Sequence, residues 1–182
     1  MKITRLAIPD VLLIEPARHG DHRGFFSETF KASVFAEAVP GVVFVQDNHS
    51  LSAAAGVLRG LHFQAPPRAQ GKLVRVTAGA IFDVALDIRR GSPTYGAHVS
   101  AVLSAENWAQ LWVPPGFAHA FQTTAPDTQV LYKTTDEYDP PSEGGVAYDD
   151  PDLRIAWPIA PAVLSERDKG WPRLAAFATP FA

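Results

Sequence analysis

Short apolar runs separated by turn residues dominate the hydrophobic pattern of this chain. The runs are rich in Val, Ile, Leu and Phe, and prolines and glycines interrupt them too often for long helices. Segments of this kind are predicted as strands at Val42–Val45, Lys72–Thr77, Ala80–Ile88, His98–Leu103, Gln110–Val113, Ala118–Thr124 and Thr128–Thr134. Between two of them, Ala78-Gly79 predicts a tight hairpin. Many short strands at even spacing favour an all-β sandwich or closed barrel.

Only one segment has a helical pattern. Apolar residues recur at three- and four-residue steps over Glu28–Ala38, which predicts a short helix that Pro40-Gly41 ends. The tail from Pro151 onward is rich in proline and is expected to be irregular, packed by Leu153, Ile155, Trp157 and Leu164. Because no repeat, linker or shift in composition divides the chain, residues 1–182 are expected to form one domain.

The composition describes a globular chain and excludes several classes of protein. Apolar residues make up 47% and charged residues 19% of the 182 positions. The net charge of −3 and the lack of a Lys/Arg run give no basis for nucleic-acid binding. Since there is no cysteine, disulfides, thiolate nucleophiles and cysteine zinc sites are excluded. No apolar stretch approaches the roughly 20 residues of a membrane span, and the first residues lack a signal-peptide pattern, so a cytoplasmic protein is expected.

The strongest candidate for chemistry lies in two nearby segments, Arg59–Gln64 and Gln70–Arg75. They place a potential base, His62, close in sequence to two cations, Arg59 and Lys72. A base beside fixed positive charge can remove a proton next to a carbonyl and stabilise the resulting enolate. The same charges suit a phosphorylated substrate, so an enzyme acting on a nucleotide-linked ketone is a serious hypothesis.

Two histidines, His62 and His119, stand among apolar strand residues. Buried imidazoles need hydrogen-bond partners, and taken alone each is most simply explained as a satisfied core residue. His119 follows a Pro-Gly turn in Pro114–Phe121, which is similar to the second motif of the cupin double-stranded β-helix. Metal-binding cupins add a His-x-His pair and a Glu, whereas His62 is followed here by Phe63 and Gln64. Two histidines are too few for the usual first-row metal site, so no metal is expected.

The order and spacing of eight motifs resemble the dTDP-4-dehydrorhamnose 3,5-epimerases from about residue 3 to about residue 174. These motifs are Asp21–Glu28, Gln46–Ser50, Leu58–Gln64, Gln70–Arg75, Ile81–Arg89, Pro114–Phe121, Tyr132-Lys133 and Leu164–Asp168. The resemblance implies an all-β, cupin-like jelly roll with a short helix, working as a homodimer without metal or cofactor. It further implies an isomerase that epimerises C3 and C5 of dTDP-4-keto-6-deoxy-D-glucose to give dTDP-4-keto-L-rhamnose. That reaction belongs to dTDP-L-rhamnose biosynthesis, which supplies lipopolysaccharide and cell-wall polysaccharide.

The resemblance also implies a role for each candidate catalytic residue. His62 would be the base, Asp168 would orient and polarise its imidazole, and Lys72 would stabilise the enolate near the C4 oxygen. Inversion returns the proton on the opposite face, and Tyr132 matches the family's proton donor for C5. A phenol with a reference pKa of about 10 stays protonated at neutral pH and can donate.

Ten further positions correspond to substrate-binding residues of the family, some of them across the dimer interface. For the diphosphate and sugar these are Arg23, Arg59, His119 and Arg167, because guanidinium groups pair bidentately with phosphate oxygens. For the nucleotide or sugar they are Glu28, Gln46, Asp47, Asn48 and Glu143. Tyr138 would flank the thymine.

Departures from the family pattern are few and leave the catalytic residues intact, and three alternatives to the family's activity are open. Arg167 stands where many relatives have Lys, and Tyr148 with the Asp after it stands where Trp and Asn are common. The first alternative is an enzyme that epimerises C3 only, or a 3,4-ketoisomerase on the same scaffold; Tyr132 favours double epimerisation instead. A metal-dependent cupin oxygenase is opposed by the incomplete ligand set. A non-catalytic sugar-nucleotide-binding cupin is opposed by the presence of His62, Lys72 and Asp168.

Overall fold

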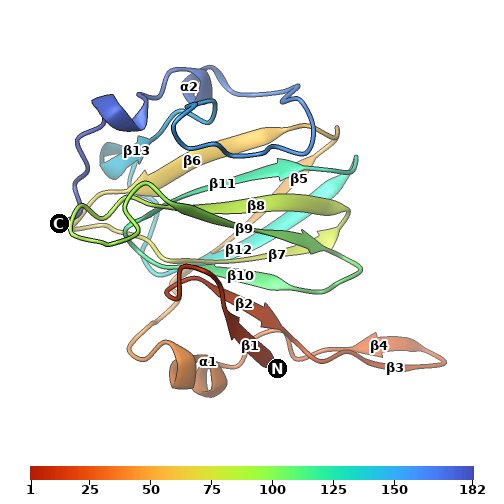
Figure 1. The fold of residues 1–182 in the computed structure, drawn as a ribbon. Helices are drawn as coiled ribbons and strands as arrows, with labels where there is room; N and C mark the ends of the chain where they lie inside the picture. The colour runs from red at the N-terminus through yellow and green to blue at the C-terminus, as the bar shows by residue number, and fades with distance from the viewer.

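Two antiparallel β-sheets packed face to face form the body of the protein in a computed structural model that describes residues 1–182 (Figure 1). In spatial order, the six-stranded sheet contains β1 (Lys2–Arg5), β2 (Leu12–Glu15), β10 (Gln110–Val113), β7 (Lys72–Ala78), β12 (Thr128–Thr134) and β5 (Gln46–Ser52). The five-stranded sheet contains β13 (Glu143–Gly145), β6 (Leu58–Gln64), β11 (Phe117–Thr123), β8 (Ala80–Asp87) and β9 (His98–Ser104). A small hairpin consists of β3 (His19–Asp21) and β4 (Gly24–Phe26). The helical elements are α1 (Ala32–Ala38), α2 (Glu166–Lys169) and 3-10 turns at Pro140–Ser142 and Leu174–Ala176.

The chain changes sheet at almost every connection in the body of the fold. From β5 to β13 it alternates between the two sheets, except that β8 and β9 follow each other and pair within the five-stranded sheet. Consecutive strands therefore face each other across the interior instead of forming hairpins. This winding confirms the predicted all-β, cupin-like jelly roll.

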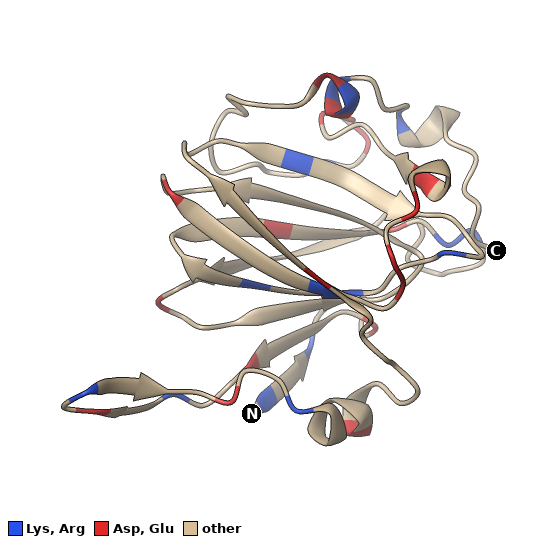
Figure 2. Ribbon diagram, turned by 180° about the vertical axis from the view of Figure 1, so that it is seen from behind, with Lys and Arg blue, Asp and Glu red and all other residues tan.

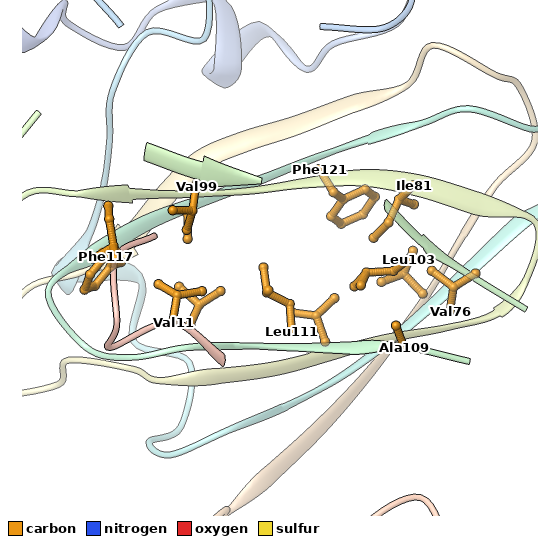
Figure 3. Close-up of a cluster of buried hydrophobic side chains, with 14 residues drawn as sticks. Val11, Val76, Ile81, Val99, Leu103, Ala109, Leu111, Phe117 and Phe121 are labelled. Carbon is orange, nitrogen blue, oxygen red and sulfur yellow. The ribbon is translucent and has the colours of Figure 1, made fainter. Parts of the chain in front are cut away.

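The main hydrophobic core lies between the two sheets (Figure 3). Ile81 and Phe121 from the five-stranded sheet meet Val76 and Leu111 from the six-stranded sheet, and all four side chains are buried. Successive residues of a strand point to opposite faces, so each strand contributes every second residue to this core. The apolar surface removed from water here is the main force that holds the sheets together.

The structure confirms six of the seven predicted strands. Gln110–Val113 and Thr128–Thr134 have the predicted bounds, and the other four differ by one residue at one or both ends. Their apolar residues alternate or run continuously because one or both faces are buried, which is the signal used to predict them.

The predicted strand Val42–Val45 is wrong. The strand of this region is β5, which begins one residue later, at Gln46. Val43 and Val45 are exposed to solvent, while Phe44 packs edge-on against Trp112. Most inward positions of β5 are polar, so an apolar pattern could not reveal it.

The predicted hairpin at Ala78-Gly79 is also wrong, because β7 and β8 belong to different sheets. The chain crosses the interior at Gly79, whose φ of +72° favours glycine. A Cβ at this position would lie 2.2 Å from the Thr128 Oγ1, so the crossing also depends on a close approach to β12. The turn residues were recognised correctly, but they do not encode which strands pair.

Helix α1 is shorter than predicted. It begins at Ala32 and not at Glu28, since Lys31 is extended and the Thr29 carbonyl accepts a hydrogen bond from the Gln110 side chain. The helix ends at Ala38, before Pro40-Gly41, as predicted. None of the helices is both long and apolar enough to cross a membrane.

The C-terminal tail is only partly irregular. Leu153, Ile155 and Trp157 pack against the five-stranded sheet as predicted. The expectation of an irregular tail is wrong for α2, which forms because the Ser165 side chain accepts a hydrogen bond from the Asp168 N–H. Leu164 lines a cavity instead of this apolar cluster.

Candidate active site

A cavity of about 780 Å³ opens where the inner faces of the two sheets continue past the apolar core. Along β7, Val74 and Val76 belong to the core, whereas Lys72 lines the cavity. Along β12, Val130 belongs to the core and Tyr132 lines the cavity. The rest of the wall comes from strands β5, β6 and β11, from Gln70, Tyr138 and Glu143, and from the segment 163–168. A concave site of this volume is typical of a small-molecule pocket.

The cavity brings together all four predicted catalytic residues and seven of the ten predicted binding residues. In chain order these are Gln46, Asn48, Arg59, His62, Lys72, His119, Tyr132, Tyr138, Glu143, Arg167 and Asp168. They come from both sheets, from the connection that carries Tyr138 and from α2, so residues far apart in the sequence meet only through the fold.

His62 on β6 and Asp168 on α2 form a hydrogen-bonded pair, with 2.5 Å between Nε2 and Oδ1. The His62 side chain is 26% exposed and that of Asp168 is 5% exposed. Because Nε2 donates to the carboxylate, Nδ1 carries the free lone pair and is the nitrogen available to a ligand. The pair thus presents an imidazole of defined tautomer to the cavity.

The surroundings of Asp168 keep its carboxylate ionised. Burial raises the pKa of Asp168, but hydrogen bonds with His62 and Ser165 and the nearby Trp171 indole outweigh this effect, so its pKa lies below the usual value. Trp171 also packs edge-on against the His62 ring, with ring centroids 6.2 Å apart. Gly145, the partner of His62 in the β13–β6 ladder, leaves room for this indole, because a Cβ there would lie 2.5 Å from it.

Gly60 explains how Arg59 and His62 both reach the cavity. Residues three apart in a regular strand point to opposite faces. The register between β6 and β11 shifts here, and Gly60 has a φ of +123°. A Cβ on Gly60 would lie 2.5 Å from the His119 carbonyl oxygen. The order Arg-Gly-Leu-His therefore requires glycine in its second position.

Lys72 brings a positive charge to the cavity from the first position of β7. Burial lowers the pKa of its ammonium group to about 8, although the negative charges of Glu143 and Asp83 oppose this change. At neutral pH most of the molecules still carry the charge. Such a cation can stabilise an oxyanion that forms inside the cavity.

Tyr132 enters the cavity from the six-stranded sheet, whereas His62 enters from the five-stranded sheet. Burial raises the pKa of the Tyr132 phenol; the charge of Arg59 opposes this rise, and Glu143 adds to it. The phenol is therefore protonated at neutral pH and is a hydrogen-bond and proton donor. A base and an acid thus reach the same space from different sheets.

Five of the predicted binding residues form one connected network. The Glu143 carboxylate pairs with Arg167 and accepts a hydrogen bond from the Tyr138 hydroxyl at 2.8 Å. The Tyr138 backbone N–H donates to Gln46 Oε1 at 2.9 Å, and Gln46 Nε2 donates to Asn48 Oδ1 at 3.0 Å. These contacts order polar groups along the cavity before any ligand binds.

His119 forms a second imidazole–carboxylate pair, with 2.6 Å between its Nε2 and Asp83 Oδ1. It is the direct partner of His62 in the β11–β6 ladder, and both members of its pair are buried. The structure contains no group of three or more His, Cys, Asp or Glu side chains that could hold a metal ion.

Three predicted binding residues lie outside this cavity. Arg23 pairs with Asp21 at 2.5 Å on the β3–β4 hairpin, which projects from the sandwich and carries both signs of charge (Figure 2). Glu28 is exposed in the segment between β4 and α1. Asp47 pairs with Lys133 at 2.9 Å and lines a second cavity of about 430 Å³. Their roles stay predictions.

Sequence reasoning missed three side chains that support the cavity. Asp83 could have been found, because a carboxylate inside an apolar strand must find a buried partner. Ser165 could also have been found, since a serine three residues before an acidic residue is typical of a helix N-cap. Trp171 gave no signal, because its contact with His62 exists only in the folded chain.

The family profile described as "dTDP-4-dehydrorhamnose 3,5-epimerase" matches residues 5–176. The chain belongs to this family. A protein of that name from Pseudomonas aeruginosa is 56% identical over 93% of this chain and 93% of its own length. The crystal structure of the 3,5-epimerase RmlC from Legionella pneumophila, in complex with dTDP-4-keto-L-rhamnose, has a TM-score of 0.93. It is 46% identical, over 97% of this chain and 94% of that one.

Other activities exist on similar structures. ChmJ, described as a 3'-monoepimerase from Streptomyces bikiniensis and solved in complex with dTDP-quinovose, has a TM-score of 0.88 at 36% identity. The similarity covers 93% of this chain and 86% of ChmJ. The fold alone therefore does not separate inversion of two carbons from inversion of one.

Proposed function

We propose that this protein inverts C3 and C5 of dTDP-4-keto-6-deoxy-D-glucose and so produces dTDP-4-keto-L-rhamnose for dTDP-L-rhamnose biosynthesis. The observation that carries this proposal is the His62–Asp168 pair, held at 2.5 Å in the same cavity as Lys72 and Tyr132. Membership of the 3,5-epimerase family and the likeness to a structure that holds the 4-keto-L-rhamnose nucleotide support this choice of substrate.

His62 is the base in this mechanism. The C4 ketone makes the protons on C3 and C5 acidic, and the free Nδ1 of His62 takes one of them. The C–H bond breaks, its electron pair moves toward the C4 oxygen, and the imidazolium that forms is stabilised by the ionised Asp168. No electrons are gained or lost, so the step is an isomerisation.

Lys72 stabilises the enolate, because its ammonium group adds a positive charge beside the developing oxyanion. Burial lowers the pKa of this group to about 8, so it is charged at neutral pH and is only weakly hydrated. Charge–charge interactions are stronger in a site that excludes water. The same burial that lowers the pKa thus makes the charge more effective.

Tyr132 completes inversion at C5 by returning a proton on the face opposite His62. The two groups enter the cavity from different sheets, and the raised pKa of Tyr132 keeps its phenol protonated. Protonation on the face from which the proton was removed would restore the starting configuration, so a second donor is required. At C3 the returning proton comes from solvent water, and His62 releases its proton to solvent before the second abstraction, while Tyr132 regains a proton from solvent after it has donated.

The remaining polar residues of the cavity bind the nucleotide and sugar. Arg59, Arg167 and His119 bind the diphosphate and sugar, since guanidinium groups match phosphate oxygens. Gln46, Asn48 and Glu143 contact the nucleotide or sugar, and Tyr138 flanks the base.

The protein also works as a homodimer in this proposal. Figure 1 shows that the β3–β4 hairpin projects from the sandwich, and its Phe25 and Phe26 are 51% and 73% exposed. Large apolar side chains left exposed on a projecting element are typical of an interaction surface. A second copy that covers them would bring Arg23 and Glu28 toward its own cavity.

Epimerisation of C3 alone is the second candidate, favoured by the likeness to the 3'-monoepimerase ChmJ. Incubation of the substrate with the protein in heavy water, without added metal or NAD, separates the two by NMR. We expect deuterium at both C3 and C5. Exchange at C3 alone would establish the monoepimerase, and exchange at neither carbon would refute both activities.

A further inference from the structure

Gln64 is a buried side chain at the end of β6 whose polar atoms are all engaged by the backbone. Its Nε2 donates to the carbonyl oxygens of Arg68 at 2.7 Å and Glu137 at 3.1 Å. Its Oε1 accepts a hydrogen bond from the Asp139 N–H at 2.8 Å. Although Gln64 borders the cavity, both of its N–H groups and its oxygen are engaged away from a ligand.

Two of the residues whose backbone groups bond to Gln64, Glu137 and Asp139, stand on either side of Tyr138 in the sequence. The Tyr138 N–H is held in turn by Gln46, so two side chains fix three consecutive residues. Tyr138 belongs to none of the three hydrophobic clusters and is 50% exposed. Hydrogen bonds, and not packing, therefore determine where its ring lies.

We propose that Gln64 is a positioning residue that places Tyr138 at the cavity and so sets the affinity for the nucleotide part of the substrate. This inference rests on the proposed function, in which Tyr138 flanks the base. Gln64 takes no part in the chemical step, because its polar atoms are engaged by the backbone and none of them is free to move a proton. Its loss should therefore weaken binding and leave the chemical step intact.

The test compares Gln64→Met with a matched control, Gln122→Met. Methionine keeps the length and apolar volume of the side chain and removes its hydrogen bonds. Gln122 is also fully buried, and it holds the backbone of Ile159 in the same way, with bonds of 2.7 Å and 3.2 Å. Ile159 does not line the cavity, so Gln122→Met should cost stability without changing affinity.

For Gln64→Met we expect the Kd for dTDP, measured by calorimetry, and the KM for the substrate to rise about tenfold, which corresponds to about 1.4 kcal/mol. The kcat should stay within about twofold of the wild-type value. Unchanged affinity, or an equal loss of affinity in Gln122→Met, would overturn the proposal.

A double-mutant cycle gives the second readout. Tyr138→Ala should weaken dTDP binding, and adding Gln64→Met to it should weaken binding little further, because the positioned ring is already gone. If the two substitutions weakened dTDP binding additively, Gln64 would not act through Tyr138, and the proposal would be contradicted. If Gln64→Met does not fold, Gln64→Glu replaces it, since it keeps the oxygen that accepts from Asp139 and loses both donors.

Hydrogen exchange separates failure of this inference from failure of the proposed function. In the protein without ligand, Gln64→Met should speed amide exchange in residues 136–142 and leave β8 unchanged. This result requires no turnover, so it holds even if the wild-type protein exchanges neither C3 nor C5. Unchanged protection of the amides of residues 136–142 would refute the positioning role of Gln64, whatever reaction the protein catalyses.

Discussion

Two imidazole–carboxylate pairs border the same cavity on neighbouring strands, and they differ in what they leave accessible. His62 and Asp168 are 2.5 Å apart, and the His62 side chain is 26% exposed. His119 and Asp83 are 2.6 Å apart, and their side chains are 8% and 0% exposed. The chemistry of the two pairs is the same, so access decides that only the first can act as a base toward a substrate.

The two carboxylates also come from different parts of the fold. Asp83 lies on β8, which is paired with the strand that carries His119, and its Oδ2 is buried without a partner. Asp168 lies outside both sheets on α2, where Ser165 caps the helix. A pair built within one sheet is a fixed part of the interior, whereas a pair between a strand and a helix borders open space. We infer that the His119–Asp83 pair mainly supports the fold and that the His62–Asp168 pair supports catalysis.

The largest effect is expected from Asp168→Asn, which breaks the catalytic half of the comparison. The amide can no longer stabilise the imidazolium, so kcat should fall roughly 10³-fold, as expected when a carboxylate partner of a histidine base is removed. The exchange rate at C3 and C5, measured by NMR, reports this loss, and circular dichroism checks the fold. A kcat near the wild-type value would show that His62 works without Asp168.

Asp83→Asn tests the structural half of the comparison. Replacing the charged acceptor of a buried hydrogen bond weakens that bond, so the free energy of unfolding in urea should fall by about 2 kcal/mol. The kcat should fall far less than in Asp168→Asn. Unchanged stability, together with a loss of kcat as large as that of Asp168→Asn, would reverse the roles assigned to the two pairs.

The smallest effect is the dependence of activity on alkaline pH. Lys72 has a pKa of about 8 and acts as the ammonium form, so kcat/KM should fall about tenfold between pH 7 and pH 9. The negative charge of Asp83 raises this pKa, and its removal in Asp83→Asn should therefore move the fall to lower pH. Asp168→Asn should not move it.

Lys72→Arg provides the control for this pH profile, because a guanidinium group stays charged throughout this pH range. The alkaline fall should disappear in that variant, even if its activity is lower at every pH. An unchanged alkaline fall in Lys72→Arg would assign the titration to another group.

The sequence predicted the sheets better than it predicted how the chain joins them. Strands such as Gln110–Val113 are buried, and their apolar pattern follows from that burial. The false hairpin at Ala78-Gly79 arose because turn residues report local backbone shape and not strand pairing. The strand β5 was misplaced for a functional reason, since its inward residues Gln46 and Asn48 line a polar cavity.

The site shows the same division between local and long-range information. The motif around His62 pointed to a base near positive charge without reference to any fold. The approach of Asp168 to His62 could be expected only from the family resemblance. The two residues are far apart in the sequence, and the course of the C-terminal tail that brings α2 to β6 has no local signal. The contact of Trp171 with His62 and the hydrogen bonds of Gln64 to residues 68, 137 and 139 correspond to no local pattern in the sequence.

The central claim is that His62, and not His119, removes the protons at both carbons. Its most direct test is deuterium exchange at C3 and C5 of dTDP-4-keto-6-deoxy-D-glucose. The exchange is compared between His62→Asn and His119→Asn at equal concentrations of folded protein, checked by circular dichroism. We expect His62→Asn to lose exchange at both carbons by roughly 10³-fold, while His119→Asn retains both at saturating substrate. Exchange near the wild-type rate at either carbon in His62→Asn would contradict the claim.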